Sequence, residues 1–259
     1  MDCDRPIGVF DSGVGGLSIL RALRAELPQE DFVYFSDAAH APYGEKDEGF
    51  VSERSLAIAV DLLERHRIKG LVVACNTATA AAVHLLRAKH TQLPVVGVEP
   101  ALKPAAAWTR TGHVAVLATR STLASAKFRS LLDSLHGQAE FELVPCDGLA
   151  AAIEAHDSER IAALCERYTR ELSGFGTAAG EIDTVVLGCT HYPFATDVFR
   201  ELLGEQVQLV ETGQPVARQT RRLLERQALL NPRGEGKVRW QTNGSPQALR
   251  GAAARWLGL

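Results

Sequence analysis

Two cysteines in matching sequence contexts are the residues best placed for chemistry. Cys75 lies in the stretch Val-Val-Ala-Cys-Asn-Thr, and Cys189 lies in Val-Leu-Gly-Cys-Thr-His. Each follows a short apolar run that is typical of a buried strand, and we expect each to lead into a helix. A thiol at a helix N-terminus lies at the positive end of the helix dipole, so it ionises more readily. We therefore predict two reactive thiols, in separate halves of the chain, that serve the two faces of one small substrate.

The neighbours of both thiols are small and polar. Asn76 and Thr77 follow the first thiol, and they offer hydrogen-bond donors and acceptors without bulk. Gly188 precedes the second thiol and permits a ligand to approach the backbone closely. Thr190 and His191 follow it, and the imidazole could tune the thiol or relay a proton. These residues predict two polar sites built on strand ends.

Three other interpretations of the cysteines are weaker. A lone buried cysteine is most often structural. A zinc site needs about four ligands, usually at Cys-x₂₋₄-Cys or His-x₃₋₅-His spacing, and neither spacing occurs around Cys189-Thr190-His191. We therefore predict no metal. Nucleophilic catalysis by Cys75 with His191 stays open, but it leaves the second cysteine unexplained.

A glycine-rich loop, residues 11–16, joins the first apolar run to a helical pattern. Gly13 and Gly15 are followed by Ser18, so the third glycine of a dinucleotide-binding fingerprint is absent. No Lys-Ser/Thr pair follows either, which excludes a Walker loop. One interpretation is a tight turn. The other is a loop that binds a carboxylate, with Asp11 as a polar catalytic group.

Short apolar runs alternate with helical patterns along the chain, and this order predicts mainly parallel sheets covered by helices on both faces. In open parallel sheets, ligands bind beyond the carboxyl ends of the strands, and Asp11, Cys75 and Cys189 all lie at such ends. The predicted strands cover residues 7–10, 32–35, 71–74, 95–98, 114–118, 141–144, 184–187, 208–210 and 238–241.

Composition narrows the class of protein. The 259 residues carry a net charge of −3, which favours neither nucleic acid nor an anionic membrane as partner. No apolar run is long enough to cross a membrane, and the N-terminus has no signal-peptide pattern. Five cysteines, an odd number, are typical of free thiols in a reducing compartment. We expect a cytoplasmic enzyme. The arginine-rich stretch at residues 218–239 is best interpreted as a solvated helix face.

Several segments together resemble glutamate racemases of the aspartate/glutamate racemase family, in the expected order and over nearly the whole chain. Members that act on aspartate tend to have Cys-Thr-Glu at the second cysteine, so His191 favours glutamate. Cys-Pro often stands before an acidic residue in this family, whereas Cys146-Asp147 precedes Glu154 here. The segments that carry the resemblance are residues 7–17, Asp37 with Pro42-Tyr43-Gly44, residues 74–80, residues 97–101 and Leu187-Gly188-Cys189-Thr190-His191-Tyr192-Pro193.

The resemblance implies an α/β fold of two pseudo-symmetric domains, each a mainly parallel sheet flanked by helices, with the active site in the interdomain cleft. The first domain would combine residues 1–97 with 211–259, and the second would be residues 98–210. Cys75 and Cys189 would be the catalytic acid and base. Asp11 would assist Cys75, and His191 with Glu154 would assist Cys189. The implied substrate-binding residues are Asp11, Ser12, Tyr43, Gly44, Asn76, Thr77, Thr190 and His191.

The implied activity is a cofactor-independent racemisation that makes D-glutamate for bacterial cell walls. Racemisation removes the Cα proton from one face and adds a proton at the other, so two opposed groups suit it better than one. A pyridoxal enzyme would need a Schiff-base lysine, and no lysine lies in a comparable strand-end context. The alternatives are an aspartate racemase, a two-lobed amino-acid-binding module and a regulatory protein. The implied partner is glutamate, and a homodimer is common in the family.

Overall fold

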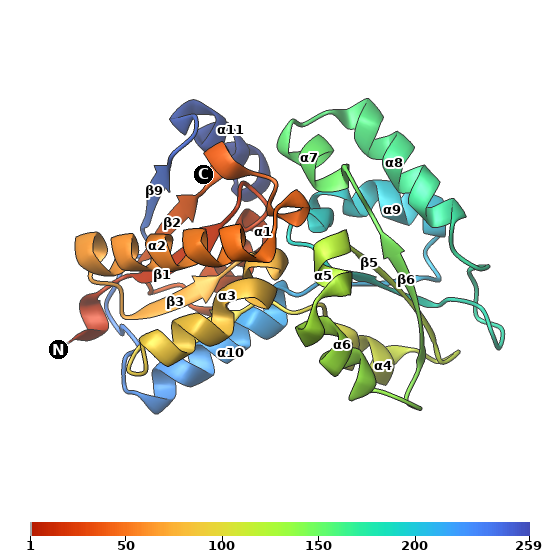
Figure 1. Ribbon diagram of the computed structural model, residues 1–259, viewed down its shortest axis with the longest axis horizontal. Coiled ribbons are helices and arrows are strands. Elements are labelled where there is room, and N and C mark those ends of the chain that lie inside the picture. Colours follow the sequence, from red (N-terminus) through yellow and green to blue (C-terminus); the bar gives the residue numbers. More distant parts are fainter. Residues whose placement is uncertain (1) are drawn as a thin grey trace. The chain divides into compact units, whose positions relative to one another are not determined.

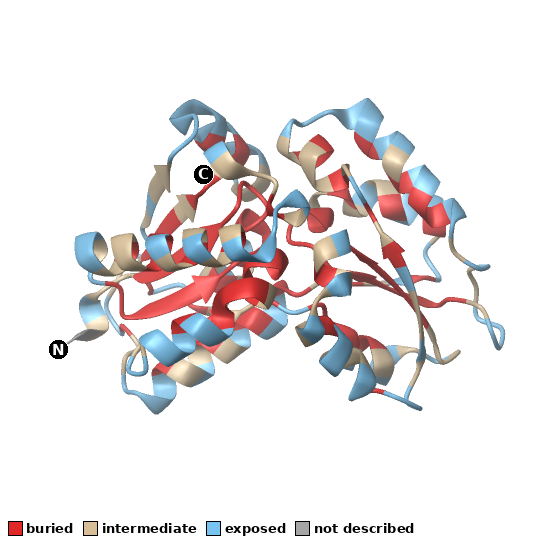
Figure 2. Cartoon of the chain, in the orientation of Figure 1, coloured by how far each residue is buried: buried red, intermediate tan, exposed pale blue. Residues whose placement is uncertain are grey.

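The computed structural model describes residues 2–259, which form two compact units. The first unit runs up to Val98 and resumes at Gly213, and the second is Glu99–Thr212. Each unit contains a sheet with helices on both faces (Figure 1). The strands inside each sheet are largely buried, whereas the edge strands at residues 140–145 and 238–242 and the outward faces of the helices are mostly exposed or half-buried (Figure 2). No described helix is long and apolar enough to cross a membrane.

The first unit is built on a five-stranded sheet with the order β4-β3-β1-β2-β9, and all its strand pairs are parallel. Its strands are β1 (Ile7–Asp11), β2 (Phe32–Ser36), β3 (Gly70–Val73), β4 (Val95–Gly97) and β9 (Val238–Thr242). Its helices are α1 (Leu17–Glu26), α2 (Glu48–His66), α3 (Asn76–Lys89), α10 (Gly213–Arg226) and α11 (Pro246–Leu257), with the short 3₁₀ helices η1 (Asp2–Asp4), η2 (Ala38–His40) and η3 (Tyr43–Glu45).

The core of the first unit explains why its inner strands, β1, β2 and β3, are mainly apolar. Parallel strands in the middle of a sheet are covered on both faces, so successive side chains are all buried. Residues of β1, β2 and β3 pack with α2 and α3 in one cluster, which includes Phe10, Leu71 and Leu62. Helix α1 packs against α10 and α11. The segment that returns at Gly213 therefore completes this unit with two helices and the strand β9.

The second unit is built on a four-stranded parallel sheet with the order β6-β5-β7-β8. Its strands are β5 (His113–Ala118), β6 (Glu140–Pro145), β7 (Thr184–Leu187) and β8 (Gln208–Val210). Its helices are α4 (Leu102–Trp108), α5 (Arg120–Ala124), α6 (Ala126–Asp133), α7 (Leu149–Glu154), α8 (Ser158–Arg170) and α9 (Thr196–Leu203), with the 3₁₀ helix η4 (Tyr192–Ala195).

Strand alternation divides the core of the second unit into two clusters. Side chains of a strand point alternately to the two faces of its sheet. Val114 and Val116 join the cluster that contains α4 and α6, whereas Ala115 and Leu117 join the cluster that contains α7, α8 and α9. Both sheet faces are therefore dry, and polar side chains gather at the strand ends. The predicted α/β fold with parallel sheets is confirmed.

Candidate active site

The loop after β1 is a tight turn held by the Asp11 side chain and by a hydroxyl from β2. Asp11 is fully buried, and its Oδ2 accepts a hydrogen bond from the N–H of Gly13 at 2.9 Å. The hydroxyl of Tyr34 donates to the carbonyl of Gly13 at 2.9 Å. A Cβ at Gly16 would lie 2.7 Å from the Cβ of Asp11, so glycine is needed there for close packing. The glycines thus account for the turn, and the turn fixes the Asp11 carboxylate at the strand end.

Cys75 is the N-cap residue of α3, where its thiol replaces the usual capping oxygen. Its backbone is extended, with φ −136° and ψ 123°, and its Sγ accepts a hydrogen bond from the N–H of Ala78 at 3.5 Å. The same sulfur lies 3.9 Å from the Oγ of Ser12. The residue is 5% exposed. The helix dipole and the capping N–H both favour negative charge on this sulfur.

The first turn of α3 is anchored to the neighbouring strands. Nδ2 of Asn76 donates to the carbonyl of Val98 at 3.3 Å. Oγ1 of Thr79 donates to the carbonyl of Val73 at 3.2 Å and accepts from the N–H of Val98 at 2.9 Å. Within residues 2–259, the buried Oδ1 of Asn76 has no hydrogen-bond partner. Asn76 and Thr77, both predicted to bind substrate, therefore lie in a fixed turn directly after Cys75.

Tyr43 belongs to a buried network centred on Asp37. Both residues are at most 1% exposed, and the Tyr43 hydroxyl donates to Oδ2 of Asp37. Burial raises the pKa of Tyr43, and the bond to the Asp37 carboxylate raises it further, so the hydroxyl stays protonated. Asp37 also accepts hydrogen bonds from Arg54 and Asn243 and contacts His40. The sequence indicated Tyr43, Gly44 and Asp37, but it gave no signal for the other three residues.

Cys189 has a different environment from Cys75. It follows β7 but caps no α-helix: a turn leads into η4, and α9 begins only at Thr196. The expectation of a helix N-terminus at Cys189 is therefore wrong. Its Sγ lies 3.7 Å from Nδ1 of His191, and Nε2 of His191 lies 2.8 Å from Oε2 of Glu154.

These contacts form a chain of three titratable side chains in the second unit. The side chains of His191 and Glu154 are 6% and 24% exposed, so the imidazole is enclosed and the carboxylate reaches the surface. A carboxylate at Nε2 holds the proton there, and this tautomer turns the lone pair of Nδ1 toward the thiol. Cys189, Thr190, His191 and Glu154 thus come together in the second unit. Asp11, Ser12, Tyr43, Asn76, Thr77 and Cys75 lie in the first.

Two further cysteines of the second unit, Cys146 and Cys165, are buried thiols, and the Sγ of Cys146 donates to the carbonyl of Val144 at 3.5 Å. Burial raises the pKa of Cys165 to about 12. Burial also raises the pKa of Cys146, and the neighbouring Cys165 and Cys189 raise it further. Both groups therefore stay protonated near neutral pH, and they pack in the apolar core of this unit. Their apolar surroundings contrast with the hydroxyl near Cys75 and the imidazole near Cys189.

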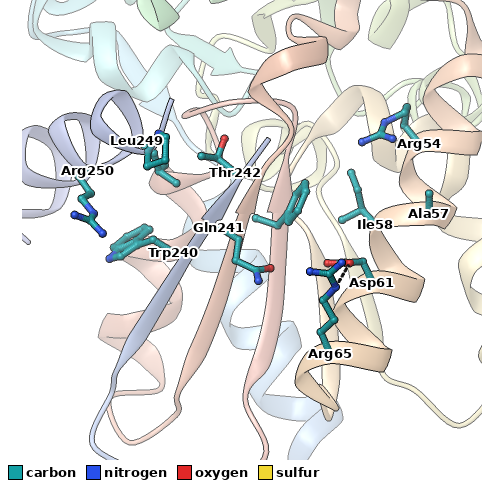
Figure 3. Close-up of a pocket in the computed structure, with 12 residues that line it drawn as sticks. Arg54, Ala57, Ile58, Asp61, Arg65, Trp240, Gln241, Thr242, Leu249 and Arg250 are labelled. Atoms are coloured by element: carbon teal, nitrogen blue, oxygen red, sulfur yellow. Dashed lines mark ion pairs between the residues drawn. The ribbon is translucent and has the colours of Figure 1, made fainter. Parts of the chain in front are cut away.

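Two cavities lie apart from the predicted residues. One, of about 630 Å³, lies in the first unit beside β9, and Arg54, Arg65, Trp240 and Gln241 are among its lining residues (Figure 3). Another, of about 1200 Å³, lies in the second unit and includes Trp108. Neither is lined by a predicted catalytic or substrate-binding residue. Among the described residues, no group of three or more His, Cys, Asp or Glu side chains could hold a metal ion.

Comparison with known proteins defines the class. The family described as Asp/Glu/Hydantoin racemase matches residues 17–220. The chain belongs to this family of racemases. The prediction that it is a racemase is therefore confirmed.

Several relatives that match most of the chain are glutamate racemases. The glutamate racemase of Pseudomonas syringae pv. tomato is 50% identical over 230 residues, which cover 88% of this chain and 82% of the relative. The crystal structure of glutamate racemase isoform RacE1 from Bacillus anthracis matches with a TM-score of 0.86 and 30% identity, over 98% of this chain and 94% of that one.

The Escherichia coli glutamate racemase, solved with L-glutamate and the activator UDP-MurNAc-Ala, matches with a TM-score of 0.83 and 33% identity, over 97% of this chain and 95% of that one. The resemblance to glutamate racemases and the α/β fold class are thereby confirmed.

Proposed function

We propose that this protein interconverts L-glutamate and D-glutamate, with Cys75 and Cys189 as the two bases and without a cofactor. The observation that carries the proposal is that each thiol has its own polar partners. Cys75 caps a helix and lies near Ser12, and Cys189 lies against His191. The glutamate racemases among the relatives support the substrate, as does the L-glutamate in the Escherichia coli structure.

The reaction conserves protons. One cysteine thiolate takes the Cα proton of one enantiomer and becomes a thiol, while the electron pair of the C–H bond delocalises into the substrate carboxylate. The other cysteine, a thiol at the start, then gives its proton to the opposite face of Cα and becomes a thiolate. The product is the mirror image of the substrate. At the end of the reaction the proton lies on the first sulfur, and the second sulfur is the thiolate. The proposal requires that both sulfurs reach one Cα.

Stabilisation of the carbanion is the larger part of the task, because a Cα proton is far less acidic than a thiol. Preorganised donors aimed at developing negative charge lower such barriers most. The first turn of α3 offers backbone N–H groups and the side chains of Asn76 and Thr77 for this purpose. Asp11, Ser12, Tyr43, Gly44 and Thr190 would complete the binding of glutamate.

The two cysteines would depend on different assistants. His191 would exchange a proton with Cys189, and Glu154 would hold the imidazole in the tautomer that permits it. Asp11 would assist Cys75 from the end of β1. We further propose that the two compact units are the functional domains and that the D-glutamate supplies peptidoglycan synthesis in the cytoplasm.

Polarimetry with L- and D-glutamate, without added cofactor and with a chelator present, tests the proposal. We expect optical rotation to decay to zero from both enantiomers, and deuterium from heavy water to appear at Cα of the product. Aspartate serves as the competing substrate, and a higher kcat/KM for aspartate would contradict the assignment to glutamate. Binding of glutamate without a change in rotation would instead indicate a binding module.

A further inference from the structure

The carboxylate of Asp37 is the centre of a buried network in the first unit. Its side chain has no exposed surface, and it accepts hydrogen bonds from three parts of the chain. The Tyr43 hydroxyl comes from η3. Arg54 donates from α2 through Nε at 3.1 Å and Nη2 at 2.6 Å. Nδ2 of Asn243, in the turn after β9, donates at 2.5 Å.

The charges of this network keep Asp37 ionised. Burial alone would raise the pKa of Asp37, but the bonds from Arg54, Tyr43 and His40 outweigh burial and hold the pKa below its usual value. The carboxylate raises the pKa of Arg54 in turn. A buried carboxylate is stable only with such partners, because an unpaired one carries a large desolvation cost. The network is therefore a fixed ionic anchor.

The anchor holds the loop formed by residues 37–45, which carries two of the proposed substrate-binding residues, Tyr43 and Gly44. The N–H of Asp37 donates to the carbonyl of Asp11 at 3.0 Å, which ties the start of the loop to the end of β1. The loop approaches the first thiol, since Tyr43 and Cys75 belong to the same buried cluster and η3 packs against α3. The position of the Tyr43 ring thus depends on the position of the Asp37 carboxylate.

Two residues outside the loop fix that carboxylate. Arg54 binds both of its oxygens, which sets its plane as well as its place. Asn243 uses both ends of its amide, because Oδ1 accepts from the N–H of Ala39 at 3.0 Å while Nδ2 donates to Asp37. One amide therefore joins the C-terminal segment to two points of the loop.

We propose that Arg54 and Asn243 are positioning residues for substrate binding, which act through Asp37 on Tyr43 and Gly44. Arg54 lies within α2 and Asn243 directly follows β9, and neither residue belongs to the motifs that carry the resemblance. The proposal rests on the proposed function, because it assumes that the loop 37–45 holds glutamate. Its consequence is that binding by this loop depends on a helix and on a turn that lie outside the loop itself.

The cavity beside β9 makes Arg54 accessible from outside. Arg54 lines this cavity of about 630 Å³ and its side chain is 28% exposed (Figure 3). Truncation of Arg54 would leave an empty, guanidinium-sized space that opens into the cavity and ends at the Asp37 carboxylate. A small guanidinium ion could enter and restore the lost charge and donors. Arg65 lines the same cavity but pairs with Asp61 at 2.7 Å, so it is a matched control.

The test compares Arg54→Ala, Arg54→Lys, Asn243→Ala and Arg65→Ala in glutamate racemisation assays. Misplacement of a binding group by about 1 Å can cost ~10²-fold in rate. We expect kcat/KM to fall about 100-fold in Arg54→Ala and about 10-fold in Arg54→Lys and Asn243→Ala, mainly through a raised KM. Methylguanidinium at millimolar concentration should restore a large part of the activity of Arg54→Ala. Arg65→Ala should match the wild type with and without the ion.

The outcomes separate this proposal from the proposed function. Wild-type protein that does not racemise glutamate contradicts the proposed function. Active wild type with a normal KM in both Arg54→Ala and Asn243→Ala overturns the positioning roles. Equal loss of kcat in Arg54→Lys and Arg54→Ala, with a lowered melting temperature and no response to methylguanidinium, would also overturn them, because it would indicate a purely structural contact.

Discussion

The two thiol sites differ in the kind of polar group that surrounds each sulfur. Cys75 relies on fixed dipoles, namely the N-terminus of α3, the Ala78 N–H and the hydroxyl of Ser12. Cys189 relies on titratable groups, because His191 contacts the sulfur and Glu154 contacts the imidazole. A fixed dipole favours one charge state permanently, whereas an imidazole can change its charge together with the thiol. The two bases of the proposed reaction therefore share a strand-end position but differ in their tuning.

The largest effect expected concerns the thiols themselves. We predict that Cys75→Ala and Cys189→Ala each lower kcat/KM for glutamate by about 10³-fold or more, since general acid–base groups contribute ~10²–10⁴-fold. Both variants should keep the circular dichroism spectrum and melting temperature of the wild type to within a few degrees.

Cys3→Ala is the matched control for the thiol variants, because the Lys69 side chain binds the carbonyl of Cys3 and not its sulfur. We expect wild-type activity from it. Near-normal racemisation by either Cys75→Ala or Cys189→Ala would contradict the two-base assignment, since a single base would then suffice.

The second effect tests the titratable groups beside Cys189, which are His191 and Glu154. We predict that His191→Asn lowers kcat about 100-fold and that Glu154→Gln lowers it about 10-fold, because Glu154 acts only through the imidazole. In His191→Asn, proton transfer at Cys189 becomes the slow step. A primary isotope effect from Cα-deuterated glutamate should then be large for the enantiomer that Cys189 deprotonates and small for the other.

Equal isotope effects from both enantiomers in His191→Asn would show that the imidazole serves both thiols. The matched control is Glu171→Gln, because Glu171 is an acidic residue of the same unit that pairs with Arg167 at the surface. This substitution should leave kcat and both isotope effects unchanged.

The strand ends of both sites could be predicted from the sequence, but the contacts around them could not. The strands at residues 184–187 and 208–210 have the predicted bounds. The first lies inside its sheet and is buried along its whole length, which is why it is mainly apolar. The turn after Cys189 was missed because Thr190-His191-Tyr192-Pro193 fits a helix start as well as a 3₁₀ turn. Arg54 and Asn243 were missed because their link to Asp37 spans distant segments and has no periodic signal.

The third effect concerns stability and belongs to the first unit alone. The folded state holds the pKa of Asp37 below the ordinary value of 3.8, so the folded protein binds this proton less readily than the unfolded chain. The stabilisation by ionised Asp37 is therefore present above about pH 4 and is lost as the pH falls through the lower folded pKa. We predict that Asp37→Asn destabilises by about 2 kcal/mol at pH 7, and that the difference shrinks below pH 4.

Urea unfolding of wild type and Asp37→Asn at pH 7 and at pH 3 measures this difference. The control is Asp47→Asn, which keeps a capping oxygen at the start of α2. A difference that is the same at both pH values would mean that the Asp37 side chain acts by shape and not by charge.

The smallest effect distinguishes the two sites most directly. The Ser12 hydroxyl lies 3.9 Å from the Cys75 sulfur, a long contact even for sulfur, so its loss should cost about 1 kcal/mol or less. We predict that Ser12→Ala lowers kcat/KM about three- to fivefold. The isotope effect should then rise for the enantiomer that Cys75 deprotonates, whereas His191→Asn should raise it for the other enantiomer.

The paired substitution at the second site is Thr190→Val, which should raise the isotope effect for the same enantiomer as His191→Asn. If Ser12→Ala and Thr190→Val raise the effect for the same enantiomer, the two strand ends do not serve opposite faces of Cα, and the difference between their partners has no role in the choice of face.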